Sequence, residues 1–276
     1  MLLGFVAVLL VACAPAVADS PAVADVHAVA DVHAVAAAAA LPAGPQRLDE
    51  AFPPPPGASR VPADGFGAYL RGLTLYPADR QVLTHLGAPV AMPAARVVDL
   101  PLVRGDLQQC ADSILRLRAT WERNDGRDPA FRYTSGDLSR WSEWKQGTRL
   151  VVSGNRVTRV VGKAKADASD ASFEAWMADL FTYAGTRSLP TDAPAATGPI
   201  APGDFLVTPG SPGHAVLILD VATRGDDAWV LVGQGYMPAM DFHVVEGETD
   251  GWFAVTGDTL DTRPIPMSWA TRCRFP

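Results

Sequence analysis

The spacing of apolar residues predicts one long amphipathic helix before the middle of the chain. Apolar side chains recur every three or four positions from Leu107 to Trp121, and Cys110 lies near the start of this stripe. Asp106 and Gln109 have the spacing of a capping box, in which a carboxylate accepts hydrogen bonds from the first free amides. We therefore expect a helix that begins close to Asp106 and carries Cys110 in its first turn.

Shorter patterns predict three further elements. Residues 66–75 read as a short amphipathic helix followed by an extended segment. Residues 151–161 alternate around Ser153-Gly154-Asn155, which is typical of a β-hairpin. Residues 172–184 predict a second helix, with Ser172 as its N-cap and Gly185 as its stop.

The last third of the chain predicts consecutive strands. Apolar and polar residues alternate over 204–208, 214–221, 228–234 and 241–245, and the turn-forming residues 209–213 separate the first two runs. Strands with such short links pair as an antiparallel meander. Helices that precede an antiparallel sheet define an α+β fold.

Polar residues stand at informative points of this meander. His214 opens the second strand and Gln234 ends the third, so antiparallel pairing would bring Gln234 close to the beginning of the second strand. We expect Asp220 to be a polar group at the end of a strand. His243 falls on a presumed edge strand, where we expect it to be exposed.

Cys110, His214 and Gln234 together predict nucleophilic catalysis. A thiol in the first turn of a helix lies in the positive end of the helix dipole, which favours the thiolate. A histidine can activate such a thiol, and an amide oxygen can orient the imidazole. Backbone amides at the helix start could form an oxyanion hole. The secondary candidates are Gln108, Gln109 and Tyr236.

Aromatic residues are interleaved with polar ones between the long helix and the hairpin. Tyr133, Trp141 and Trp144 lie among serines and charged residues. They could line a substrate groove that binds glycan or peptide, or they could pack beneath a long loop. The sequence leaves both interpretations open.

The beginning of the chain resembles an export signal. Residues 1–12 are almost wholly apolar, and Leu10 stands three positions before Cys13, as in a bacterial lipobox. No Lys or Arg precedes this run, although signal peptides usually have a basic start. We expect removal of residues 1–12 and lipidation of Cys13; a plain secreted protein and an uncleaved anchor are the alternatives.

A low-complexity segment follows the signal. Residues 17–35 repeat a six-residue unit, and alanines and the proline run Pro53–Pro56 come next. Such a segment cannot form a core, so we expect residues 13–59 to be a flexible stalk. Residues 60–276 are then long enough for a single globular α+β domain.

Charge and cysteine content exclude several classes of function. The formal net charge is −7 and no basic run is present, so nucleic acid is not an expected partner. No C-x-x-C or HExxH motif indicates a metal site, and no cofactor is implied. Cys110 and Cys273 could form a disulfide in an exported protein, which would give Cys110 a purely structural role.

The order Cys110, His214, Gln234 resembles the papain-like fold, and in particular the NlpC-type cell-wall amidases. The string GDFLVTPGSPGHAVLILDV is similar to their glycine-aspartate strand, turn and glycine-histidine strand. The resemblance implies that Cys110 is the nucleophile, His214 the base and Gln234 the orienting residue. This chain differs by the residues 127–195 between cysteine and histidine, and by Gln-Gln-Cys-Ala around the cysteine.

Five strings resemble the bacterial family catalogued as domain of unknown function 4846. They are FGAYLRGLTL, DLQQCADSILRLRA, FTYAGTRSL, GDFLVTPGSPGHAVLILDVA and GQGYMPAMDFHVV, and the resemblance extends over residues 65–275. It implies an exported protein and assigns no reaction.

The expected function is hydrolysis of an amide bond in the cell envelope by a membrane-anchored papain-like cysteine enzyme. Peptidoglycan stem peptide is the substrate that this location suggests. One alternative is a non-catalytic lipoprotein of the same fold that binds envelope glycan or peptide. The other is a structural lipoprotein with a Cys110–Cys273 disulfide.

Overall fold

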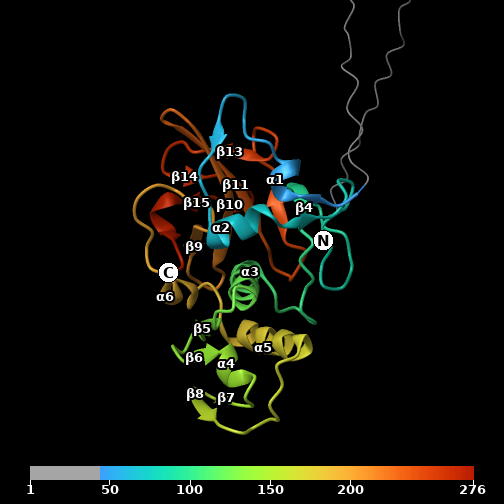
Figure 1. Ribbon diagram of the computed structural model, residues 1–276, viewed down its shortest axis with the longest axis vertical. Helices are drawn as coiled ribbons and strands as arrows, with labels where there is room; N and C mark the ends of the chain where they lie inside the picture. Colours follow the sequence, from blue (N-terminus) through green and yellow to red (C-terminus); the bar gives the residue numbers. More distant parts are fainter. Residues whose placement is uncertain (1–43) are drawn as a thin grey trace, which may run out of the picture. The chain divides into compact units, whose positions relative to one another are not determined.

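Within residues 44–276, which this computed structural model describes, eight strands form a central antiparallel sheet (Figure 1). The strand order is β16-β9-β10-β11-β12-β4, and β13 and β2 pair with β11 and β10 respectively. The bounds are β2 Ser59–Arg60, β4 Ala94–Val97, β9 Phe205–Thr208, β10 His214–Arg224, β11 Asp227–Gln234, β12 His243–Val245, β13 Trp252–Ala254 and β16 Arg272–Cys273.

The predicted antiparallel meander is confirmed, as is the mixed class of helices and antiparallel sheet. Adjacent strands β9, β10 and β11 are consecutive in the chain, with Ala215 opposite Val207 and Ile218 opposite Val232. The turn-forming residues 209–213 are short enough to join β9 to β10 as a hairpin. Short two-stranded pairings lie outside this sheet: β1 Gln46–Arg47 with β3 Thr74–Leu75, and β14 Thr259–Leu260 with β15 Met267–Ser268.

One long helix packs on the sheet. This helix, α3 (Cys110–Asn124), contacts β10 and contributes Ile114 and Leu115 to the larger of two apolar clusters. The other helices are α1 Leu48–Ala51, α2 Gly65–Arg71, α4 Trp141–Trp144, α5 Asp170–Tyr183 and α6 Leu189–Asp192.

Successive residues of β10 enter different clusters. Ala215, Leu217 and Leu219 belong to the cluster that includes α3, whereas Val216 and Ile218 belong to the second cluster. Because side chains alternate across a strand, the two clusters occupy opposite faces of the sheet.

Both predicted helix caps need correction. The N-cap of α3 is Gln109, whose backbone N–H donates to Asp112 Oδ2 at 3.1 Å, so the carboxylate lies inside the helix and not before it. Asp106 instead accepts from the Ala239 amide at 2.6 Å. The N-cap of α5 is Ser169, whose hydroxyl accepts from the Ser172 amide.

An insertion lies between α3 and β9, in the lower part of Figure 1. It contains α4 and α5 together with two hairpins, and the hairpin predicted over residues 151–161 is confirmed. The strands are β5 Ala130–Arg132, β6 Leu138–Arg140, β7 Arg149–Ser153 and β8 Arg156–Val160.

The folded part begins before the boundary expected at residue 60. β1, α1 and β2 precede or include Arg60, and β2 pairs with β10. The proline run also belongs to the fold, since the Pro53 carbonyl accepts from Trp252 Nε1 at 2.9 Å. The stalk prediction therefore fails for residues 46–59. The predicted signal, Cys13 and the earlier part of the stalk lie outside the described residues.

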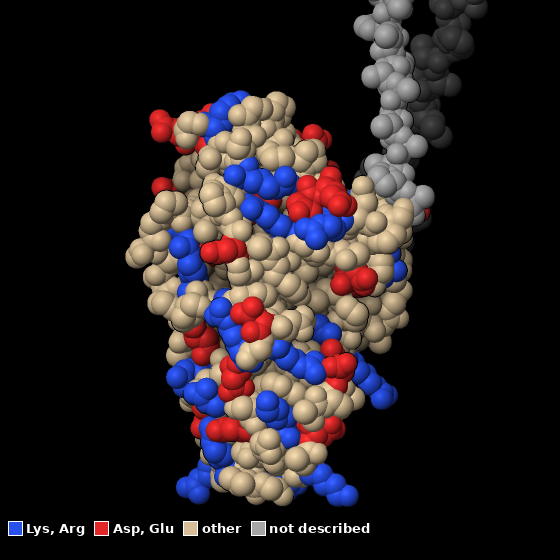
Figure 2. All heavy atoms as spheres, in the orientation of Figure 1, with Lys and Arg blue, Asp and Glu red and all other residues tan. Residues whose placement is uncertain are grey.

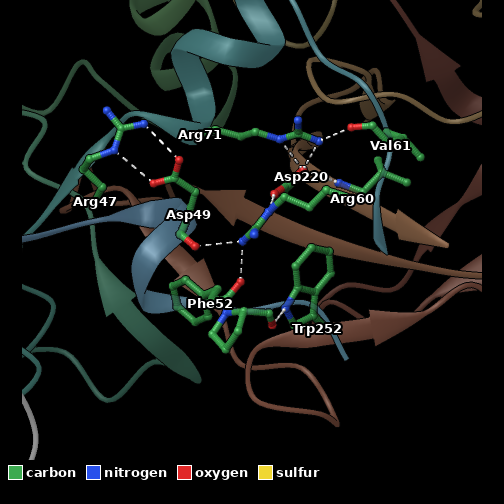
Figure 3. Close-up of polar contacts among 10 residues, drawn as sticks. Arg47, Asp49, Phe52, Arg60, Val61, Arg71, Asp220 and Trp252 are labelled. Carbon is green, nitrogen blue, oxygen red and sulfur yellow. Dashed lines mark hydrogen bonds and ion pairs between the residues drawn. The ribbon is translucent and has the colours of Figure 1, made fainter. Parts of the chain in front are cut away.

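A buried carboxylate holds this N-terminal segment to the sheet (Figure 3). Asp220 is fully buried and accepts from Arg60 Nε at 2.6 Å and from Arg71 Nε at 2.7 Å. The two guanidinium groups also donate to backbone carbonyls, Arg60 to Phe52 and Arg71 to Val61. Asp220 is thus a structural anchor in the middle of a long strand.

Acidic and basic side chains are interspersed on the face that Figure 2 shows. This face therefore offers no extended patch of one sign to a highly charged partner. Within residues 44–276, no helix has the length and apolar character needed to span a membrane.

Candidate functional site

Cys110 opens onto a pocket of about 460 Å³ at one end of the sheet. The thiol belongs to the first residue of α3, and the half-buried side chain lines the pocket. The opposite walls are the β9–β10 turn, residues 210–213, and the segment after α5, residues 184–187. Threonine hydroxyls and the exposed Arg187 add polar groups to these walls.

Burial raises the pKa of the Cys110 thiol, while the backbone amides of Ala215, Ala111 and Cys110 itself lower it. The desolvation of the charged form is the larger effect. Burial therefore opposes the stabilisation of the thiolate that was expected from the helix N-terminus. The sulfur nevertheless lies among three amide dipoles, one of which belongs to the residue after His214.

The structure brings His214 and Gln234 together. His214 Nε2 lies 3.0 Å from Gln234 Oε1, and both side chains are buried. Burial lowers the pKa of His214, with a smaller opposing effect from the Gln234 hydrogen bond. The secondary candidate Tyr236 joins them, because its ring meets the imidazole edge to face at 5.4 Å between centroids.

His243 is a member of this cluster that sequence reasoning missed. It is fully buried, with Nε2 3.3 Å from Gln234 Nε2 and Nδ1 3.0 Å from the Asp241 carbonyl oxygen. Burial lowers its pKa. The prediction that His243 is exposed fails because β12 is not an edge strand: β4 pairs with its outer side, and Val97 lies opposite His243.

Cys110 and His214 lie at the same end of the sheet. The thiol reaches the Ala215 amide, and an added Cβ on Gly235 would lie 2.9 Å from the Gln109 carbonyl oxygen. The end of β11 therefore packs directly against the start of α3.

No hydrogen bond joins the Cys110 thiol to the His214 imidazole in the part of the chain that the structure describes. His214 has the same parity as Val216 in β10, so its side chain lies on the face opposite Ala215 and α3. The His214 imidazole and the Cys110 thiol thus flank the first residues of β10 without touching.

The two glutamines before Cys110 have different surroundings. Gln108 is fully buried and its Oε1 accepts from the Val103 amide and from Arg116 Nη1, at 3.2 and 3.1 Å. Its Nε2 has no partner within residues 44–276. Gln109 lines the pocket, and its Nε2 donates to Asp106 at 3.3 Å. Of the two, only Gln109 faces the pocket.

The three aromatic candidates do not line the Cys110 pocket. Tyr133 and Trp141 are buried in the insertion, where Trp141 meets Phe173 edge to face at 5.1 Å between centroids. Trp144 is half-buried beneath Arg149, whose guanidinium carbon lies 3.5 Å from the centroid of the Trp144 ring. Trp141 thus packs against α5, and none of the three rings contributes to the pocket in front of Cys110.

Asp112 is a second pocket residue that the sequence did not reveal. It is only 6% exposed, and its Oδ1 has no partner among the residues described. Burial raises the pKa of this carboxyl to about 7. Asp112 lies off the apolar stripe of the predicted helix, so the sequence pattern contained no signal of its burial.

The described part of the chain contains neither a candidate metal site nor a disulfide. Residues 44–276 contain no group of three His, Cys, Asp or Glu side chains placed to hold a metal. Cys110 and Cys273 are both free thiols, and Cys273 pairs with Phe205 through β16. The structure therefore lacks the alternative Cys110–Cys273 disulfide.

Fold and site define a mixed α/β protein with a cysteine-lined pocket beside a buried His–Gln–His cluster. The chain belongs to the family described as domain of unknown function (4846), whose model matches residues 48–267. The family resemblance seen in the sequence is thereby confirmed. No curated protein and no solved structure matches the chain.

Proposed function

We propose that this protein is a papain-like cysteine hydrolase of the NlpC type that cleaves an amide bond. The placement of Cys110 is the main support: its thiol begins α3, lines a pocket of substrate size and lies among backbone amides. A developing oxyanion next to the sulfur would be stabilised by those N–H groups.

In the proposed reaction, Cys110 Sγ bonds to the substrate carbonyl carbon. The thiol proton passes to His214, and the negative charge moves to the carbonyl oxygen. Collapse of this intermediate breaks the C–N bond, and the amine leaves with the proton from His214. Water activated by His214 then hydrolyses the thioester, which releases the acid and restores the thiol.

His214 acts as the base and Gln234 orients it in this scheme. Nε2 is held by Gln234, and Nδ1 has no hydrogen bond to any residue within 44–276. Nδ1 is therefore the atom that must reach the thiol. The imidazole lies on the face of β10 opposite α3 and does not touch the thiol, so the scheme requires the His214 side chain to move around the end of β10 toward Cys110.

We place the enzyme at the cell envelope, with residues 1–12 removed and Cys13 lipidated. Peptidoglycan stem peptide is the proposed substrate, and this choice rests on the lipobox resemblance and the NlpC resemblance. Incorporation of labelled palmitate in the native host should be lost in Cys13→Ser and retained in Cys273→Ser. Incorporation that survives Cys13→Ser would contradict the anchor.

The hydrolase proposal is tested by incubating the intact protein with purified peptidoglycan fragments. New amino groups and cleaved peptides, measured by mass spectrometry, should form with the wild type and disappear in Cys110→Ala. The Cys273→Ser variant is the matched control and should retain activity. Cleavage that persists without the Cys110 thiol would overturn the assignment of the nucleophile.

A second function is favoured by the raised pKa of Cys110 and its separation from His214. A non-catalytic envelope protein would bind glycan or peptide in the same pocket and use Cys110 only as a lining residue. Binding of the fragments by both the wild type and Cys110→Ala, with no cleavage by either, would identify this function.

A further inference from the structure

The buried cluster at the end of β11 forms an ordered chain of hydrogen bonds. Its members are the Asp241 carbonyl, His243, Gln234 and His214, joined at 3.0, 3.3 and 3.0 Å. The first member is a backbone carbonyl, which can only accept. This fixed acceptor determines which atom donates and which accepts in each of the other hydrogen bonds.

The direction follows atom by atom. His243 Nδ1 must carry a proton because it faces the Asp241 oxygen. A buried, neutral imidazole has a single proton, so His243 Nε2 is an acceptor. The amide NH₂ of Gln234 therefore faces His243, and the Gln234 oxygen faces His214.

We propose that His243 is a positioning residue that fixes the orientation of the Gln234 amide and thereby the tautomer of His214. With the Gln234 oxygen as its partner, His214 Nε2 carries the proton and Nδ1 keeps a free lone pair. Only this tautomer leaves Nδ1 free to act as the base in the proposed reaction. The consequence for catalysis rests on the proposed function, whereas the order of the hydrogen bonds does not.

Backbone pairing holds the chain in place. Gln234 and His243 are directly opposite in the β11–β12 register, so their side chains emerge on the same face. Both lie beside the apolar cluster of Val82, Val97 and Met240, against which Tyr236 packs. This cover keeps water from replacing His243 as the partner of Gln234.

The wild-type protein provides the first test. Long-range nitrogen–proton correlation spectra of protein labelled with ¹⁵N-histidine show which ring nitrogen of each histidine carries the proton. We expect protonated Nδ1 in His243 and protonated Nε2 in His214, with assignments from single substitutions. A proton on Nδ1 of His214, or on Nε2 of His243, would overturn the proposal.

Two variants of His243 separate positioning from packing. His243→Phe keeps a ring of similar size and removes the acceptor, so the Gln234 amide can turn and His214 should populate both tautomers. His243→Gln restores an acceptor oxygen and should restore the single His214 tautomer. A single wild-type tautomer in His243→Phe would show that His243 only fills space.

Reactivity gives an independent measurement. Since a positioned base contributes about 10²–10⁴ to such a reaction, we expect alkylation of Cys110 to slow about tenfold in His243→Phe and to recover in His243→Gln. If the histidine tautomers are as expected but Cys110 of the wild type does not react, the positioning role of His243 is supported and the hydrolase proposal is contradicted. The two proposals therefore fail separately.

Discussion

Burial of Asp112 beside Cys110 should give the stability of the protein an unusual dependence on pH. Its carboxyl has a pKa near 3.8 when unfolded and about 7 in the folded protein, because burial disfavours the charged form. Between these values the unfolded state releases the proton and the folded state keeps it. The folded state is therefore destabilised as pH rises from about 4 to about 7, by on the order of 4 kcal/mol at most.

Asp112→Asn should remove this pH dependence. The difference in free energy of unfolding between Asp112→Asn and the wild type should shift in favour of the variant from pH 4 to pH 7 and then level off. Urea denaturation at a series of pH values measures this. The slope is the test, since the new amide could shift all values by a constant amount. A pH-independent difference would show that Asp112 is ionised in the folded protein.

For individual residues, the sequence predicted side-chain contacts that follow from the order of the strands. It did not predict contacts that depend on burial by segments distant in the chain. The meeting of His214 and Gln234 follows from antiparallel pairing of neighbouring strands. His243 could not be placed, because β4, the strand that buries it, comes before α3 in the chain. The raised pKa of Cys110 likewise depends on burial that helix position alone does not reveal.

The contact between α3 and β11 determines where the thiol lies. A Cβ on Gly235 would be 2.6 Å from Ser113 Oγ and 2.9 Å from the Gln109 carbonyl oxygen, so only glycine allows this approach. Gly235→Ala should destabilise the fold by about 1–3 kcal/mol and move Cys110 away from the Ala215 amide.

The control for Gly235→Ala is Gly44→Ala, where an added Cβ meets no atom within 4 Å. Chemical denaturation compares the two variants, and the Cys110 alkylation rate reports on the local displacement. Equal stability of Gly235→Ala and Gly44→Ala would mean that α3 and β11 are not in direct contact.

The anchor of the N-terminal segment should be strongly stabilising. Asp220→Asn leaves two partly buried guanidinium groups without their carboxylate, and loss of one partner from a buried ion pair costs about 3–5 kcal/mol. The control is Asp227→Asn, which breaks the exposed pair with Arg224 and should cost less than about 1 kcal/mol. Similar unfolding midpoints for both variants would contradict the role of Asp220 as an anchor.

At the element scale, periodicity predicted strands and helices better than it predicted their ends. The alternation over residues 214–221 and 228–234 identified β10 and β11, because strong period-two patterns need no tertiary information. The start of α3 was predicted too early because aspartate is a favoured N-cap residue. The Asp106 carboxylate instead accepts a hydrogen bond from the distant Ala239 amide. A long-range hydrogen bond replaced the local one.

At the scale of the whole molecule, the insertion between α3 and β9 shapes the pocket. Thr134, Thr182 and Thr186 come from this insertion and line the space in front of Cys110. The sequence showed that residues 127–195 separate Cys110 from His214. It could not show that the aromatic residues fill the core of the insertion while its threonines face the pocket.

The start of the folded domain also depends on contacts across the whole molecule. The segment 44–59 has the proline-rich composition of a linker, and its role in the fold comes from contacts with β10 and Trp252. Composition describes a segment alone, whereas such contacts depend on strands more than 150 residues away.

The thiol–imidazole pair is tested most directly by the rate at which iodoacetamide alkylates Cys110 in the intact protein between pH 5 and pH 9, read by mass spectrometry. Cys273, which is 7% exposed and lines no wall of the Cys110 pocket, serves as the internal comparison. We predict that Cys110 reacts faster than Cys273 and that His214→Ala slows Cys110 at pH 7 by about tenfold or more. A Cys110 that stays unreactive, or whose pH profile is the same in His214→Ala, would contradict the thiol–imidazole pair.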